Sequence, residues 1–130
     1  MKVAIGKPED ITSETMVHRV GGGSIANFRL SLLEQKLTPP GISLLLGGTP
    51  QGAATQMRQA FPSSRKWRED AQTVGTTTAA TIRQAGFELV PDPTSRFPNH
   101  ARLIHPRGVA GFTDTNLAQL ARAFYDTAGC

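Results

Sequence analysis

The 130-residue sequence has a single cysteine and no long apolar run. The cysteine is the last residue, Cys130, so an internal disulfide is excluded and a reducing compartment is expected. The longest apolar segment, ISLLL at residues 42–46, is far shorter than the roughly 18 to 20 residues that span a bilayer, and residues 1–10 lack the apolar core of a signal peptide. We therefore expect a cytoplasmic protein without membrane contact, or one delivered by a specialised secretion system without a cleavable signal peptide.

Acidic residues are absent from three long stretches, between residues 14 and 34, 34 and 69, and 92 and 114. The chain has ten Asp and Glu against 14 Lys and Arg, a formal net charge of +4. Much of the surface should therefore be positive, which favours an anionic ligand or an acidic partner, although a merely solubilising basic surface has the same composition. Clusters of Lys and Arg mixed with aromatic residues are also missing, which argues against a module dedicated to nucleic-acid grooves or single strands.

The composition, with 38% hydrophobic and 18% charged residues, is typical of a folded globular protein. The length suits one domain over residues 1–130, of which residues 1–15 are expected to be peripheral. Short strand-like segments bounded by Gly and Pro are mixed with amphipathic helical segments. We predict an α+β fold, with a small mixed or antiparallel sheet of four to six strands and three or four packed helices.

Local patterns place the individual elements. Strands are predicted at residues 2–5, 16–20, 42–46, 87–90 and 100–105, with a further extended piece at 25–30. Helical segments are predicted at residues 31–37, 50–61, 63–73, 76–85 and 113–124. Thr49 and Thr113 are expected to cap two of the helices, Gly86 to end a third, and Trp67 to turn inward from a solvated helix.

Residues 86–112 carry the main chemical signal. They hold two of the three histidines, three of the 14 Lys/Arg and four of the nine prolines. Because side chains alternate along a strand, His100 and Arg102 should share one face and His105 the other. No acidic residue lies between Asp92 and Asp114 to neutralise a buried Arg102, so we expect His100 and Arg102 to line one solvent-accessible cleft.

A second group of candidates lies on the earlier strands. His18 and Arg19 are adjacent in the segment MVHRV, and Ser43 lies inside the apolar segment ISLLL. Histidine with arginine suffices for acid/base cleavage of RNA, and also for holding a pyrophosphate. His18 can instead be a hydrogen-bonded core histidine and Ser43 a core hydroxyl. The candidate site therefore has His18 and His100 as catalytic residues and Arg19, Ser43, Arg102 and His105 as ligand-binding residues.

Several other kinds of site lack their motif. The histidines and Cys130 form no tight ligand cluster, so no metal is expected. Neither the GxSxG motif of a serine hydrolase nor an ATP-binding P-loop is present. Glu69 and Asp70 are adjacent on a solvated helix, which does not suit a glycosidase pair.

Three segments together resemble a toxin family. The early strand VHRV, the apolar strand PPGISLL with its internal serine, and the late strand HARLIHP followed by a helix resemble small bacterial toxins with an ADP-ribosyltransferase-like fold, including type VI secreted toxins and toxins of toxin–antitoxin pairs. The resemblance implies that Arg19 or His18 contacts NAD and that Ser43 supports the nicotinamide-ribose pocket. The family usually carries a catalytic glutamate on a late strand, where this chain has His100 and His105 with only Glu88 nearby.

The sequence leaves three functional hypotheses. The first is a small bacterial toxin-like or effector domain that binds an anionic nucleotide, with NAD as a possible substrate, in a cleft lined by His and Arg. The second is a metal-independent RNase toxin that uses His and Arg. The third is a non-catalytic protein-binding module, such as an adaptor, chaperone or immunity partner, whose basic face meets an acidic protein such as an antitoxin or immunity protein.

Overall fold

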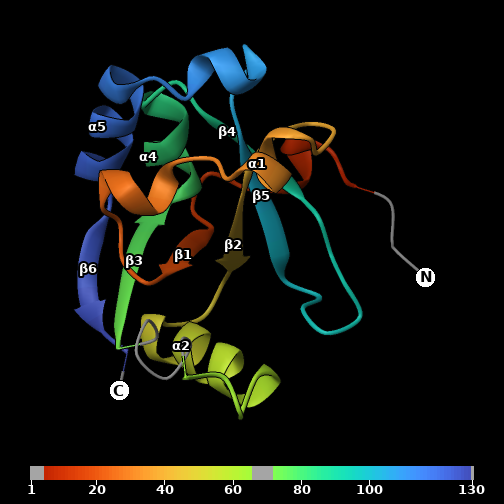
Figure 1. Ribbon diagram of the computed structural model, residues 1–130, viewed down its shortest axis with the longest axis vertical. Coiled ribbons are helices and arrows are strands. Elements are labelled where there is room, and N and C mark those ends of the chain that lie inside the picture. Colours follow the sequence, from red (N-terminus) through yellow and green to blue (C-terminus); the bar gives the residue numbers. More distant parts are fainter. Residues whose placement is uncertain (1–4, 66–71, 130) are drawn as a thin grey trace.

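An antiparallel sheet of six strands forms the centre of the structure, a computed structural model that describes residues 5–65 and 72–129 (Figure 1). The order across the sheet is β4-β5-β2-β1-β3-β6. The strands are β1 (Met16–Val20), β2 (Ile42–Leu46), β3 (Thr73–Thr78), β4 (Glu88–Pro91), β5 (His100–Ile104) and β6 (Tyr125–Ala128). The described α-helices are α1 (Leu32–Gln35), α2 (Pro50–Ala60), α4 (Ala79–Gln84) and α5 (Asp114–Ala123), and 3-10 turns lie at η1 (Pro8–Asp10), η2 (Ile25–Phe28) and η3 (Gly108–Gly111). The predicted α+β fold is confirmed.

The two faces of the sheet carry separate cores. On one face Val17, Leu44 and Leu103 pack with Ile82 of α4 and Leu120 of α5, and these two helices lie together beside the sheet in Figure 1. On the other face, a smaller cluster consists of Val20, Leu45 and Val74 from the strands and Ala53 and Ala54 from α2. Since alternate residues of a strand face opposite sides, this division follows directly from the sequence.

Strand register brings the candidate residues together. His18 lies opposite Leu45 on one side and Thr76 on the other, and Leu45 in turn lies opposite His100. Ser43 lies opposite Arg102. Residues opposite each other in an antiparallel pair point to the same face, so all of them share the face on which α2 packs.

Helix starts follow the predicted capping pattern. The Thr49 hydroxyl accepts a hydrogen bond from the Gly52 amide at the start of α2, where Pro50 occupies the first turn. The Thr113 hydroxyl accepts from the Asn116 amide at the start of α5. Each cap satisfies an amide that has no partner within its own helix.

Some elements differ from the prediction. Residues 25–28 form a 3-10 turn rather than an extended piece. Residue 73 and residues 76–78, assigned to helical segments, lie in β3, which ends before α4 begins. Threonine is both a strand former and a helix N-cap, and Thr78 caps α4 while ending β3. Strand β6, which follows α5 directly, was not predicted. Most of the strand predicted at residues 2–5, and Trp67 with most of its helix, lie outside the described residues.

Within residues 5–65 and 72–129, no helix combines the length and the apolar character needed to cross a bilayer.

Candidate functional site

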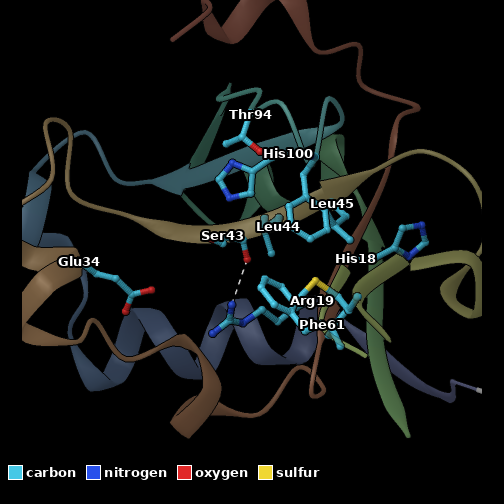
Figure 2. Close-up of a pocket in the computed structure, with 12 residues that line it drawn as sticks. His18, Arg19, Glu34, Ser43, Leu44, Leu45, Phe61, Thr94 and His100 are labelled. Atoms are coloured by element: carbon cyan, nitrogen blue, oxygen red, sulfur yellow. Dashed lines mark hydrogen bonds between the residues drawn. The ribbon is translucent and has the colours of Figure 1, made fainter. Parts of the chain in front are cut away.

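A cavity of about 380 Å³ lies over β1, β2 and β5 (Figure 2). Its lining joins residues of the α2 face, among them His18, Ser43 and His100, with Arg19 and Leu44, which alternate to the other face of the sheet. Its apolar wall includes Leu45 from β2, Met57 and Phe61 from the C-terminal end of α2, and Phe97 from the loop between β4 and β5. The Phe61 and Phe97 rings lie 6.1 Å apart between centroids and are inclined by 33°. The volume is within the roughly 300–1,000 Å³ of typical ligand pockets.

Four of the six predicted site residues line this cavity. They are His18 and Arg19 from β1, Ser43 from β2 and His100 from β5. Thr94 and Glu34 complete the polar part of the lining. Arg102 and His105 do not line the cavity, so the structure brings together most of the candidate set but not all of it.

His18 is buried, with 1% of its surface exposed, and both ring nitrogens are engaged. Its Nε2 lies 3.0 Å from the Gly47 carbonyl oxygen, and its Nδ1 lies 2.9 Å from the Thr76 hydroxyl oxygen. Because a carbonyl can only accept, Nε2 carries the hydrogen and Nδ1 accepts from Thr76. Burial lowers the pKa of His18 below its ordinary value of 6.5. This geometry favours the core histidine, which holds the turn after β2 against β1, over the catalytic role.

The lowered pKa of His18 makes stability depend on pH. In the unfolded chain histidine titrates near 6.5, so below that pH the unfolded state binds more protons than the folded state. We expect the free energy of unfolding, measured with urea, to fall between pH 7.5 and pH 5.5. The fall should be smaller in His18→Gln, which cannot titrate. An equal fall in both proteins would contradict the assignment.

Arg19 fills a gap between β1 and β2. Only Val17 and His18 of β1 pair directly with β2. Beyond them, the Arg19 guanidinium connects the two strands. Its Nη1 donates to the Ser43 carbonyl at 3.0 Å, and its Nε and Nη2 donate to the Asn27 carbonyl at 3.1 and 2.8 Å. A fixed, permanently charged group therefore stands at the wall of the cavity (Figure 2).

One ring nitrogen of His100 contacts Asp92, the residue that follows β4. Its Nδ1 lies 2.7 Å from the Asp92 backbone oxygen and 3.4 Å from the Asp92 carboxylate oxygen Oδ2. The imidazole is held close to Ser43, on the same face of the sheet, and Figure 2 shows both at the cavity. Its side chain is 15% exposed.

The expectation that Arg102 lines an accessible cleft is wrong. Arg102 is 3% exposed, its Nη2 donates to Asp92 Oδ2 at 2.9 Å, and its Nη1 donates to the Pro39 carbonyl at 2.9 Å. The carboxylate that neutralises Arg102 is Asp92, the residue at the boundary of the acid-free stretch. Asp92 continues the pairing of β4 with β5 beyond Pro91 and Ala101, and its amide donates to the His100 carbonyl at 2.9 Å, so its carboxylate meets Arg102 inside the protein.

His105 belongs to the opposite side of the sheet. Its ring meets the Phe87 ring edge-on at 4.9 Å between centroids, and its Nδ1 accepts from the Arg107 amide at 3.1 Å. A Cβ at Gly111 would overlap this ring, so the glycine is needed for the packing. Burial and the Arg107 charge lower the pKa of His105. These contacts give His105 a packing role, away from the cavity.

Glu34 is the charged residue of the cavity lining that was not among the predicted site residues. It is half-buried on α1, where its Oε1 accepts from the Ser31 amide at 2.8 Å and its own amide donates to the Ser31 hydroxyl at 3.1 Å. In Figure 2 its carboxylate points toward the space beside Arg19. The pattern Ser31-x-x-Glu34 signals a capping box. Glu88, the glutamate noted from the sequence, pairs instead with Arg83 at 2.7 Å and does not line the cavity.

The cavity thus combines a cationic group, a carboxylate, a hydroxyl and an imidazole around an aromatic wall. Such a set can hold a ligand with an anionic part and an electron-poor ring. Among the described residues, no three His, Cys, Asp or Glu side chains are grouped so as to hold a metal ion. No protein-family model, curated protein or solved structure matches the chain.

Proposed function

We propose that this protein binds NAD in the cavity over β1, β2 and β5 and transfers its ADP-ribose group. The observation that supports this most is the convergence of Arg19, Ser43 and His100 on one cavity from three strands. Two of these residues are the ones to which the resemblance to ADP-ribosyltransferase-like toxins gives NAD contacts. The basic net charge of +4 also suits an anionic nucleotide.

The charges of the cavity fit the two ends of the nicotinamide mononucleotide half of NAD. Arg19 is suited to the phosphate, because a guanidinium binds phosphate oxygens strongly. Glu34 is suited to the positively charged nicotinamide ring and to the positive charge that grows on the ribose C1′ as its bond to nicotinamide breaks. The apolar Phe61 and Phe97 rings can stack against the nicotinamide. Ser43 can bond a ribose hydroxyl.

The test is release of nicotinamide from NAD by the purified full chain, followed by chromatography. We expect turnover by the wild type and a loss of roughly 10²-fold in Glu34→Gln, the size of effect seen when one transition-state electrostatic contact is removed. Glu14→Gln removes the same charge from an exposed position outside the cavity lining and should turn over at the wild-type rate. Equal rates in wild type and Glu34→Gln would remove Glu34 from the proposal.

The same protein incubated with total RNA separates the alternatives. RNA decay without nicotinamide release would overturn the proposal in favour of a metal-independent RNase. If neither NAD nor RNA changes, the protein-binding module becomes the better account. Leu32 and Leu33 of α1, which are 76% and 78% exposed, would then be the first residues to test for contact with an acidic protein.

A further inference from the structure

We propose that His100 is the general base of this cavity, acting through Nε2 on a hydroxyl acceptor. In this proposal the Asp92 backbone oxygen fixes the tautomer of His100, and the Asp92 carboxylate, held by Arg102, is a positioning group for its ring. The inference deepens the proposed function and rests on it for the identity of the donor substrate. It assigns the class of acceptor, an alcohol or water.

The tautomer of His100 follows from its contact with Asp92. The Asp92 backbone oxygen lies 2.7 Å from Nδ1 and can only accept, so Nδ1 carries the hydrogen. In a neutral imidazole the lone pair then belongs to Nε2. Nε2 makes no hydrogen bond to any residue in the ranges 5–65 and 72–129. His18 has the opposite tautomer and both nitrogens engaged, so the two cavity histidines differ in what they can do.

The free nitrogen belongs to a residue that lines the cavity. His100 lies opposite Leu45 in the sheet, and Ser43 is two residues along β2 on the same face. Such diagonal neighbours have Cα atoms about 7–8 Å apart, which leaves room between their side chains for a substrate hydroxyl. The charged groups on the same lining are Arg19 and Glu34.

Asp92 and Arg102 hold this arrangement from inside the protein. The Asp92 amide donates to the His100 carbonyl at 2.9 Å, so Asp92 and His100 are joined through both backbone and side chain. Asp92 Oδ2 accepts from Arg102 at 2.9 Å and lies 3.4 Å from His100 Nδ1. Asp92 Oδ1 is buried and has no hydrogen-bond partner among the described residues. A carboxylate held behind an imidazole orients the ring.

The transfer is a substitution at C1′ of the nicotinamide ribose. The oxygen of the acceptor hydroxyl forms a bond to C1′ of the nicotinamide ribose while His100 Nε2 takes its proton. The bond from C1′ to the nicotinamide nitrogen breaks, and its electron pair stays on that nitrogen. The products are ADP-ribose bound to the acceptor oxygen, neutral nicotinamide and a protonated His100, which returns its proton to solvent.

The test combines NMR of the full chain labelled with ¹⁵N-histidine and turnover of NAD. We expect the neutral form of His100 to carry its hydrogen on Nδ1 and the neutral form of His18 to carry its hydrogen on Nε2. Asp92→Asn keeps an oxygen that can accept from Arg102 but loses the charge, and it should lower kcat at least tenfold with little change in KM.

Two results would overturn the inference: an Nε2-protonated His100 in the wild type, or a wild-type kcat in Asp92→Asn. These outcomes differ from a failure of the proposed function. If NAD is not turned over, the ¹⁵N spectrum still decides the tautomer of His100. If NAD is turned over and His100 carries its hydrogen on Nε2, only the assignment of His100 as general base is wrong.

Discussion

Replacing Arg102 with methionine is expected to lower the free energy of unfolding by about 3–5 kcal/mol, the cost of leaving one member of a buried ion pair without its partner. Arg102 and Asp92 have side chains only 4% and 5% exposed and lie 2.9 Å apart. The Pro39 carbonyl would lose its donor as well. Urea unfolding at pH 7.5 measures the change.

A matched control separates burial from charge. Arg29 pairs with Asp114 at 2.7 Å, but their side chains are 55% and 82% exposed. Arg29→Met should therefore cost less than about 1 kcal/mol. The double variant Arg102→Met/Asp92→Leu removes both buried charges and should recover most of the loss. A small loss in Arg102→Met, or no recovery in the double variant, would contradict the buried pair.

The second large effect is expected in catalysis. If His100 is the general base, His100→Gln should lower NAD turnover by roughly 10²- to 10⁴-fold, the usual contribution of such a group. The fold should persist, because glutamine can still donate toward the Asp92 carbonyl. His105→Gln is the control, since His105 lies five residues along the chain on the opposite side of the sheet. Equal losses in the two variants would point to a structural cause.

The fold was largely accessible from local patterns, and the reason is visible in β1, β2 and β5. Each strand is short and is flanked by Gly or Pro. Its apolar residues alternate or run continuously, and this pattern predicts a strand; where they alternate, it also predicts which face each side chain takes. Strand β3 was missed because its threonines also suit a helix start. Strand β6 has no apolar alternation, its residues being mostly exposed, and it is held in the sheet by pairing with the edge of β3.

The site could be predicted from the sequence only in part, because two of its features depend on how distant segments pack together. Asp92 reaches Arg102 and His100 because β4 and β5 pair in a register that sets Pro91 opposite Ala101, and the loop between these strands fixes that register. Glu34 reaches the cavity from α1, a short helix within the connection between β1 and β2. The pairing of His18 with Leu45 and of Leu45 with His100 depends on which strands are neighbours, and strand order is a tertiary property.

The most direct test of the proposed site is the titration of NAD into ¹⁵N-labelled protein, followed by amide NMR shifts. We predict shifts that saturate and concentrate at the cavity lining, with the largest at Ser43, Phe97 and His100. The amide signals of η3 and α5, which pack on the other face, should not shift. Saturating shifts centred on η3 and α5, or no shifts at millimolar NAD, would contradict the assignment of the cavity as a nucleotide site.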